Sequence, residues 1–361
     1  MKTLKINISR LGIGGMEQAL INLLNLSDLS KKFKIELLVG YATDPSFQNL
    51  LPQSVKTTII SKNWNLFGKI KAVFYYGIKI TKAKLFPNQY DYSISYSYQH
   101  ASISLLTRLE SENNAIFIHT DLINSRSKQA LKKLTKKIKF EKFKTIICIS
   151  ECAKQSFNTL FPNLSKNTHV INNFIDFDKI DRLSSEPINF DSKKQITFLN
   201  VSRHDNDDNK KITRILRSSK KLLSEGYDFK VLLIGGGKED KNYEKYIKSN
   251  KLNNAIYLLG EKANPYPYFL ISDALILSSK YEGYGIVMDE ARYLNLPIIS
   301  TKVGDAERIL SEGYGILCEN STDGIYIGMK EYLENGYSIK KSFDKNKFNK
   351  EINSKIMEVF K

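Results

Sequence analysis

Short apolar runs alternate with amphipathic helical stretches along this chain, and the alternation occurs in two series. The first series predicts strands at residues 4–9, 35–39, 92–97, 115–119 and 145–150, with helices such as 16–26 and 128–142 between them. The second predicts strands at 196–201, 230–234, 255–259, 274–277 and 297–300, with helices at 212–223, 243–251, 285–294 and 323–334. Strands that alternate with helices are typical of a parallel sheet covered on both faces.

A segment of weak periodicity, roughly residues 172–194, separates the two series and is predicted to be a linker. The expected fold class is therefore α/β, with two Rossmann-like, doubly wound domains facing a central cleft. We expect these domains at 1–175 and 176–342, followed by a C-terminal helical segment at 343–361 that could reach back to the first domain. Ligands of such sheets bind where strands end, near helix N-termini.

Charge is distributed unevenly between the two series. Residues 1–175 contain 25 Lys and Arg against 10 Asp and Glu, so they hold nearly all of the chain's net charge of +17. Such a basic half predicts a polyanionic partner, either nucleic acid or an anionic membrane surface. No run approaches the roughly 20 apolar residues that span a bilayer, and the N-terminus lacks the apolar region of a signal peptide, so a cytoplasmic protein is expected. The three cysteines, Cys148, Cys152 and Cys318, fit free thiols better than a zinc site.

Two candidate sites lie in the first series. Gly14 and Gly15 follow the first strand and precede a helix, where glycine lets backbone N–H groups approach a ligand closely. The spacing is not that of a dinucleotide-binding loop, and a plain turn remains the alternative. His119 ends an apolar strand, so its side chain could hydrogen-bond a sugar hydroxyl at the cleft, with a structural role as the alternative.

The second series has polar loops at three strand ends. After the strand at 196–201, Arg203 and Lys210 flank a loop and are placed as cations that bind a diphosphate would be. The same loop contains Asp205 and Asp207, which only weakly suggest a metal site. A glycine run ending at Gly237 follows the next strand and fits a turn near a nucleotide.

The segment 280–291 carries the strongest signal. Glu282 lies in the loop before a helix, Gly283 and Gly285 expose N–H groups at the N-terminus of this helix, and Glu290 lies more than a turn inside it. A carboxylate accepts paired hydrogen bonds from a diol, so two carboxylates beside an anion-binding turn could hold a sugar and a ribose with phosphates between them. Two ordinary helix glutamates are the alternative.

Two basic amphipathic stretches, residues 66–86 and 130–143, mix apolar residues with lysines. Such helices can lie on anionic lipid. They can equally pack on a core and expose their lysines, and the aromatic content of 66–86 favours the membrane for that stretch.

Taken together, these motifs resemble glycosyltransferase family 4, which has the GT-B fold, and in particular its bacterial capsular, exopolysaccharide and teichoic-acid enzymes. The segments that carry the resemblance are 264–269, 272–278, 281–285 and 296–301, the pair Glu282 and Glu290 in the family's E-x7-E spacing, the Gly14–Gly15 loop, and residues 173–176. The chain departs from the family at Ser202, where a glycine is usual, and at Lys210-Lys211, where Lys-Gly is usual. Lys211 is therefore an alternative phosphate ligand to Lys210.

The resemblance implies roles for these residues. Glu282 would contact the donor sugar, Glu290 the ribose, Arg203 and Lys210 the diphosphate, and His119 the donor sugar near the reacting centre. The full donor-binding set it implies is Gly14, Gly15, Arg203, Lys210, Lys211, Gly237, Glu282, Gly283, Tyr284, Gly285, Ile286 and Glu290, with His119, Glu282, Arg203 and Lys210 as catalytic residues. It also implies retention of anomeric configuration and no metal cofactor.

The expected function is transfer of a hexosyl or N-acetylhexosaminyl group from a nucleoside diphosphate sugar, most simply a UDP-sugar, to a cell-surface glycan precursor carried by a lipid. The protein would then lie on the inner face of the cell membrane. Alternatives are a teichoic-acid or glycolipid glucosyltransferase and a nucleotide-sugar epimerase or hydrolase of related fold. A basic nucleic-acid-binding protein is the non-enzyme alternative, but the sequence has neither a helix-turn-helix nor an aromatic-basic platform, so no nucleic acid partner is expected.

Overall fold

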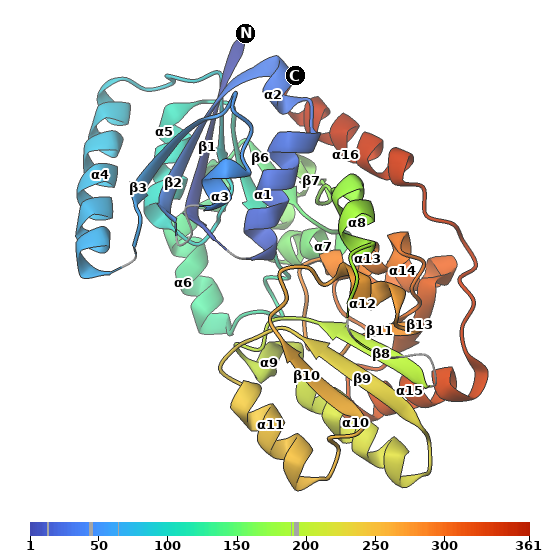
Figure 1. Cartoon of the computed structure of the whole chain (residues 1–361). Coiled ribbons are helices and arrows are strands. Elements are labelled where there is room, and N and C mark those ends of the chain that lie inside the picture. Colours follow the sequence, from blue (N-terminus) through green and yellow to red (C-terminus); the bar gives the residue numbers. More distant parts are fainter. Residues whose placement is uncertain (13, 43–45, 64, 189, 191–194) are drawn as a thin grey trace. The chain divides into compact units, whose positions relative to one another are not determined.

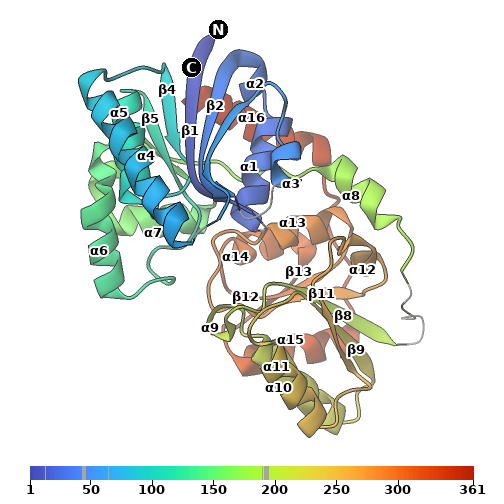
Figure 2. The ribbon, with the colours of Figure 1, turned by 60° about the vertical axis from the view of Figure 1, so that its left-hand side comes forward.

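The computed structural model describes residues 1–361 except 13, 43–45, 64, 189 and 191–194, and it divides into two compact units. Unit 1 comprises Met1–Ile175 and Asn346–Lys361, and unit 2 comprises Asp176–Lys345 (Figure 1). Each unit is built on its own parallel sheet with helices around it, as Figure 2 shows from a second direction. Two Rossmann-like α/β units, as predicted, make up the chain.

Unit 1 contains a seven-stranded parallel sheet in the order β3-β2-β1-β4-β5-β6-β7. Its strands are β1 Lys2–Leu11, β2 Phe33–Ala42, β3 Lys56–Ser61, β4 Tyr92–Ser95, β5 Asn114–Ile118, β6 Thr145–Cys148 and β7 Thr168–Val170. Its helices are α1 Gly15–Leu26, α2 Leu29–Lys32, α3 Ser46–Asn49, α4 Leu66–Leu85, α5 Ala101–Glu110, α6 Lys128–Ile138 and α7 Glu151–Leu160, with short helical turns at Phe140–Lys142 and Pro162–Asn167.

Unit 2 contains a six-stranded parallel sheet in the order β10-β9-β8-β11-β12-β13. Its strands are β8 Ile196–Val201, β9 Phe229–Ile234, β10 Ile256–Gly260, β11 Ala274–Leu277, β12 Ile298–Thr301 and β13 Gly315–Cys318. Its helices are α8 Phe177–Ser184, α9 Asp207–Lys210, α10 Ile212–Ser224, α11 Asp240–Ser249, α12 Tyr266–Leu270, α13 Ile286–Tyr293, α14 Ala306–Ile309 and α15 Thr322–Asn335, with a helical turn at Leu310–Tyr314.

The core of unit 2 explains why its strands read as continuous apolar runs. Successive side chains of a strand point to opposite faces of the sheet. In β11, Ala274 and Ile276 pack in one buried cluster with residues of α10, α11 and α15. Leu275 and Leu277 pack in another with residues of α12, α13 and α14. Both faces are therefore covered, and the polar loops are left at the strand ends.

Three strands were not predicted, and all three are sheet edges. β3, β7 and β13 each pair on one side only among the described residues. An edge strand needs less apolar sequence than a central one, and β3 is correspondingly mostly part-exposed.

The linker prediction was wrong over one stretch. α8 lies inside the predicted linker, with Asp176 accepting a hydrogen bond from the backbone N of Lys179 at its start. Phe177 is buried against Tyr293 and Phe343 of the same unit. Residues 189 and 191–194 of the predicted linker lie outside the described residues.

The C-terminal helix α16, Lys345–Val359, belongs almost entirely to unit 1. Asn353 accepts a hydrogen bond from the backbone N of Asp28 and donates one to the Asp28 carboxylate. Ile352 and Ile356 are buried. Among the described residues, none of the helices has the length and apolar character needed to cross a membrane.

Candidate functional site

The carboxylate of Glu282 is the centre of a polar cluster in unit 2. Its Oε1 atom lies 2.6 Å from Nζ of Lys210 and accepts a 2.6 Å hydrogen bond from the hydroxyl of Ser279. Only 13% of the Glu282 side chain and 22% of the Lys210 side chain are exposed. The two residues are 72 positions apart in the sequence. They meet because α9 follows β8, Glu282 follows β11, and these strands are neighbours in the sheet.

Hydrogen bonds tie the loops after β8 and β11 to each other. The Ser278 hydroxyl donates to the carbonyl of Lys210, and the backbone N of Lys280 donates to the carbonyl of Asn209. Arg214 of α10 donates to the Ser278 carbonyl at 3.0 Å. The same set of hydrogen bonds therefore holds both Lys210 and Glu282 in position. Neither Ser279 nor Arg214 was predicted. Ser279 lies only three residues before Glu282, in the same loop, whereas Arg214 reaches the Ser278 carbonyl because β8 and β11 are neighbours.

The N-terminus of α13 follows Glu282 directly. Gly285 precedes the helix with a φ of 90°, a left-handed conformation that favours glycine. A Cβ atom at Gly285 would lie 2.7 Å from Cε of Met288, so a side chain there would also meet the core. The first N–H groups of a helix carry partial positive charge and suit an anion. Lys210 and this helix end thus give the same edge of the sheet two anion-stabilising features.

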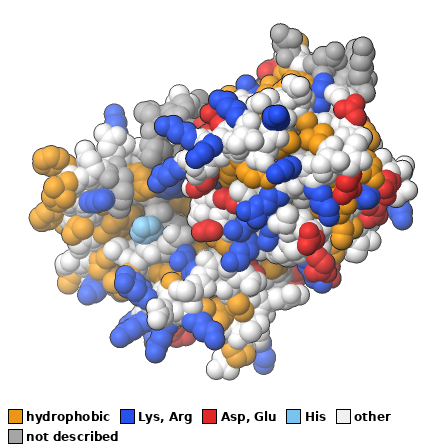
Figure 3. All heavy atoms as spheres, turned by 90° about the horizontal axis from the view of Figure 1, so that it is seen from below, with side chains coloured by type: hydrophobic (Ala, Val, Ile, Leu, Met, Phe, Trp, Pro, Cys, Tyr) orange, Lys and Arg blue, Asp and Glu red, His pale blue; other side chains and the backbone are white. Residues whose placement is uncertain are grey.

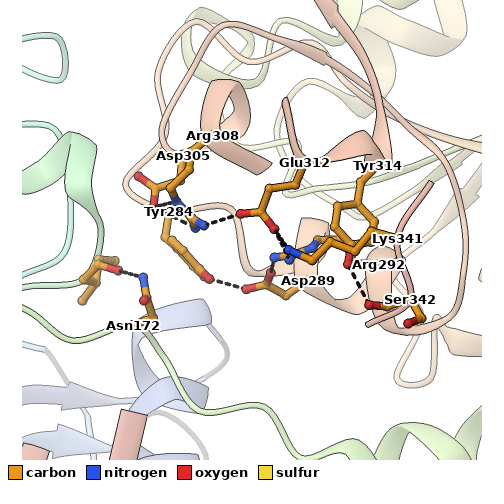
Figure 4. Close-up of polar contacts among 11 residues, drawn as sticks. Asn172, Tyr284, Asp289, Arg292, Asp305, Arg308, Glu312, Tyr314, Lys341 and Ser342 are labelled. Atoms are coloured by element: carbon orange, nitrogen blue, oxygen red, sulfur yellow. Dashed lines mark hydrogen bonds and ion pairs between the residues drawn. The ribbon is translucent and has the colours of Figure 1, made fainter. Parts of the chain in front are cut away.

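Tyr284, one of the residues predicted to bind the donor, has a buried side chain. Its side chain is 2% exposed, and its hydroxyl donates to the carboxylate of Asp289, so it cannot line a donor site with its ring (Figure 4). Arg292 pairs with the same carboxylate at 2.7 Å and with Glu312 at 3.5 Å. Desolvation by burial raises the pKa of Asp289, and Arg292 opposes this shift. Tyr284, which lies just before α13, thus packs its side chain into unit 2, so any contact of this residue with a donor would be made by its backbone.

Replacing Tyr284 with phenylalanine should therefore affect stability more than donor affinity. The change removes one hydrogen bond to a buried carboxylate, which typically contributes about 2 kcal/mol. We expect a lower free energy of unfolding in urea and an unchanged KM for the donor. A large rise in KM with unaltered stability would instead show that Tyr284 contacts the ligand.

Glu290 lies in α13 and accepts a 3.0 Å hydrogen bond from the hydroxyl of Tyr266. Burial raises the pKa of the Glu290 carboxyl from 4.5 to about 7. The hydrogen bond opposes that shift. Tyr266 was missed as a partner, although it lies in the segment 264–269 that carries the family resemblance. Glu290 is thus a carboxyl group poised to change charge near neutral pH.

The remaining cations of the β8 loop have different surroundings. Arg203 is 63% exposed and lies 3.7 Å from Asp205. Lys211 has a φ of 51° and places its Nζ 3.4 Å from Asp208. Lys210, rather than Lys211, therefore contacts Glu282.

Asp205 and Asp207 weakly suggested a metal site. In the part of the chain that the structure describes, no group of three His, Cys, Asp or Glu side chains could hold a metal ion. Asp207 instead accepts hydrogen bonds from the backbone N of Thr213 and the hydroxyl of Tyr243. Gly237 packs tightly in a neighbouring loop, since a Cβ atom there would lie 2.2 Å from the carbonyl carbon of His204. Ile286 begins α13, and Gly283 lies between it and Glu282.

In unit 1, His119 follows the end of β5 and is surrounded by aromatic rings. Its Nε2 lies 2.8 Å from the carbonyl oxygen of Tyr96, and its ring lies 5.7 Å from that of Phe117. Burial lowers the pKa of His119 to about 4, so the imidazole is neutral at physiological pH. A carbonyl only accepts hydrogen bonds, so Nε2 must carry the proton and Nδ1 is left as an acceptor.

The glycine loop of unit 1 borders a small pocket. A Cβ atom at Gly14 would lie 2.4 Å from the Glu17 carboxylate, whereas one at Gly15 would meet nothing within 4 Å. Arg10 pairs with Glu17 at 2.5 Å. The pocket has a volume of about 260 Å³ and is lined by Ser9, Arg10, Met16, Tyr41, Ser97, Tyr98, Gln99 and His100. It lies at the carboxyl ends of β1, β2 and β4, and the sequence analysis did not find it.

Comparison with known proteins agrees with this architecture. The family described as "Glycosyl transferases group 1" matches residues 181–351. An uncharacterized glycosyltransferase of Methanocaldococcus jannaschii is 29% identical over 180 residues, which are 48% of this chain and 44% of the relative. The N-acetylgalactosamine-N,N'-diacetylbacillosaminyl-diphospho-undecaprenol 4-alpha-N-acetylgalactosaminyltransferase of Campylobacter jejuni is 26% identical over 188 residues, 50% of this chain and 49% of the relative. The chain thus matches about half the length of these curated relatives.

Solved structures extend the likeness of fold to the whole chain. A crystal structure of Anabaena Alr3699/HepE in complex with UDP and glucose has a TM-score of 0.75, covering 100% of this chain and 99% of that one at 16% identity. The two Rossmann-like sheets and this likeness define the GT-B fold. Residues 181–351, just under half of the chain, match the group 1 glycosyltransferases, family 4.

Proposed function

We propose that this chain transfers a hexosyl or N-acetylhexosaminyl group from a UDP-sugar to a lipid-linked glycan precursor, with retention of anomeric configuration. The observation that carries the proposal is the Glu282 carboxylate, held by Lys210 and Ser279 beside the N-terminus of α13. It combines a hydrogen-bond acceptor for sugar hydroxyls with a cation and a helix end for phosphates. The Anabaena structure, which contains UDP and glucose, supports the choice of donor.

Each residue of the site has a distinct role in this proposal. Glu282 accepts hydrogen bonds from the donor sugar, and Glu290 accepts them from the ribose. Lys210, with Arg203, stabilises the negative charge that develops on the diphosphate as the bond between the sugar carbon and the phosphate oxygen breaks. A new bond forms between that carbon and an acceptor oxygen, whose proton passes to a phosphate oxygen of the leaving group. No metal ion is part of this scheme.

The raised pKa of Glu290 predicts a pH dependence of donor binding. The carboxylate accepts two ribose hydrogen bonds only when it is ionised, so affinity should be full near pH 8 and fall as the pH drops through about 7. At pH 6 roughly one-tenth of the groups would be ionised, which predicts affinity weaker by up to about tenfold.

Titration of UDP by calorimetry between pH 6 and 8 measures this effect. The matched control is Glu290→Gln, which keeps the shape of the side chain and leaves only the titration of UDP itself. Identical pH profiles for both proteins would exclude Glu290 as the titrating ribose ligand.

In our proposal unit 1 supplies the acceptor site and further ligands for the donor. The neutral His119 offers its Nδ1 atom to a hydroxyl of the donor sugar. The pocket beside Arg10 offers aromatic, amide and hydroxyl side chains of the kind that bind sugars. We also propose that backbone N–H groups of the loop at Gly14 and Gly15 hydrogen-bond the donor.

The lipid carrier is inferred from two observations. Residues 1–175 hold an excess of 15 positive charges, which suits an anionic membrane surface. The name of the Campylobacter jejuni relative specifies a sugar linked to diphospho-undecaprenol. Teichoic-acid and glycolipid acceptors belong to the same chemical class. We therefore place the enzyme on the inner face of the cell membrane as a peripheral protein.

A screen of nucleotide sugars tests the proposed reaction. Released nucleoside diphosphate is measured with and without a lipid extract as acceptor, and with and without chelator. We expect release from one UDP-sugar, dependent on acceptor and insensitive to chelator. A change of the sugar alone, without acceptor, would identify an epimerase, and release as free sugar would identify a hydrolase.

A further inference from the structure

Helix α4 of unit 1 presents its large apolar side chains to solvent. Phe67, Phe74 and Ile78 are 79%, 69% and 68% exposed. The exposed apolar residues of the helix are Leu66, Phe67, Ile70, Val73, Phe74, Ile78 and Leu85. In Figure 3 apolar side chains gather at the left edge of the face shown, the side on which α4 lies in Figure 1. A soluble helix normally turns such residues toward the core.

The opposite face of α4 already packs on the unit. Its buried residues are Gly68, Ala72, Tyr76 and Ala83, and they contact residues of β2, β3 and α5. At Gly68 a Cβ atom would lie 1.9 Å from the carbonyl oxygen of Asn63, so this face is held close to the backbone. The face of α4 that packs on unit 1 consists mainly of small residues, and most of the large apolar residues lie on the exposed face. The exposed face is therefore the one available to another partner.

The exposed apolar residues form one ridge. Phe67, Ile70, Phe74, Ile78 and Leu85 follow one another at intervals of three, four, four and seven residues, which keeps them on one side of an α-helix. Lys69, Lys71, Lys82 and Lys84 of the same helix are exposed. The chain contains no Asp or Glu from residue 45 to residue 90. The charged side chains in this stretch of sequence are therefore all lysines, and those next to the ridge are positive.

Helix α6 shows that the other basic stretch has a different role. Its apolar residues Leu134 and Ile138 are buried in a core cluster with residues of β5, β6 and α7. Its exposed residues are five lysines, Gln129 and Ala130, and none of them is a large apolar residue. The membrane interpretation of residues 130–143 therefore has no apolar face to support it, whereas that of 66–86 does.

We propose that α4 is an interfacial membrane anchor whose ridge of Phe67, Ile70, Phe74, Ile78 and Leu85 inserts at the surface of an anionic bilayer. This deepens the proposed function, on which the lipid-linked acceptor rests, by naming the membrane-binding element. Aromatic and aliphatic side chains enter the boundary between headgroups and acyl chains, and the lysine stems extend along the helix so that their ammonium groups reach lipid phosphates.

The lysines favour a lipid over a protein partner. Lysine is depleted in protein–protein interfaces, while aromatic residues alone would suit either partner. An anionic headgroup layer instead attracts each lysine that lies near its surface. Charge complementarity thus selects an anionic membrane, and a second copy of this equally basic helix would be repelled.

Vesicle binding by the full chain tests the proposal. Vesicles of phosphatidylcholine with and without phosphatidylglycerol are sedimented with the protein. Wild type should bind the anionic vesicles only. Phe67→Ser/Phe74→Ser should raise the lipid concentration for half-binding at least about tenfold, with unaltered circular dichroism. Ile327→Ser, which changes a 59% exposed residue of α15, is the matched control and should bind as wild type does.

Two further measurements isolate charge and insertion. Lys71→Gln/Lys82→Gln on α4 should weaken binding more than Lys245→Gln/Lys248→Gln on α11, although both remove two charges. The only tryptophan, Trp64, precedes α4 by two residues, so its emission should shift to shorter wavelength on addition of anionic vesicles. This shift should be lost in Phe67→Ser/Phe74→Ser.

Three results would overturn the proposal. They are equal binding by the phenylalanine variant and wild type, failure of wild type to bind anionic vesicles, and self-association of wild type that the same two substitutions abolish. The last would assign the ridge to an interface between copies. Release of UDP from a UDP-sugar is measured in parallel without vesicles. Turnover without vesicle binding rejects only the anchor, and vesicle binding without turnover rejects only the proposed function.

Discussion

Replacing Glu282 with glutamine is expected to lower kcat/KM for the donor sugar about a thousandfold or more, which corresponds to about 4 kcal/mol of transition-state stabilisation. The carboxylate, held by Lys210 and Ser279, would lose its charge and part of its capacity to accept hydrogen bonds from the sugar. UDP lacks the sugar, so its affinity should change by no more than about threefold. Initial rates and UDP titration measure the two quantities.

A matched control separates this effect from a general change of charge. Glu307→Gln also removes one carboxylate of unit 2, but Glu307 is 61% exposed and pairs with Lys302. This variant should retain wild-type activity, as should Cys148→Ala. Near-normal turnover by Glu282→Gln would contradict the assignment of the donor site.

Lys210→Ala is expected to lower kcat by about a hundredfold to a thousandfold, or about 3–4 kcal/mol, because an unshielded diphosphate is a poor leaving group. Lys211→Ala should cost less than about tenfold, since its ammonium group contacts Asp208 instead. The two variants are compared in single-turnover reactions at saturating donor. A larger loss in Lys211→Ala would assign the phosphate contact to the second lysine of the pair.

Central strands were predictable from sequence because both of their faces are buried. β8 and β11 have the predicted bounds; β11 is apolar throughout, and β8 is apolar except for Thr197 and Asn200. β3, β7 and β13 were missed because an edge strand need not be apolar throughout. α8 was missed for another reason: Phe177 and Ile180 are its only buried residues, too few to stand out in a polar segment.

The candidate site was predictable in outline only. The positions of Lys210 and Glu282 in segments after strands, and of Glu290 inside the following helix, follow from the pattern of elements. The contact between Lys210 and Glu282 does not, because it requires β8 and β11 to be neighbours. The inward orientation of Tyr284 could not be predicted either. Its partner is Asp289, which is buried and paired with Arg292, but in the sequence these two residues look like ordinary exposed polar residues of a helix.

The same limit applied to the two basic helices. Residues 66–86 and 130–143 have similar composition, and only packing tells them apart. The buried face of α4 includes Gly68, Ala72 and Ala83, and most of its large apolar residues are exposed. In α6 the large apolar residues Leu134 and Ile138 are themselves buried. Periodicity alone shows that a helix has an apolar face, and it does not show whether a core covers that face.

The central claim is that unit 2 holds a nucleoside diphosphate sugar whose sugar this chain transfers to a lipid-linked acceptor. The most direct measurement supplies a radiolabelled UDP-sugar and a lipid extract, and follows UDP and label extracted into organic solvent. We expect equal amounts of both, unaffected by chelator and lost together in Glu282→Gln. Release of UDP without label in the lipid fraction, or equal incorporation by Glu282→Gln and wild type, would contradict the claim.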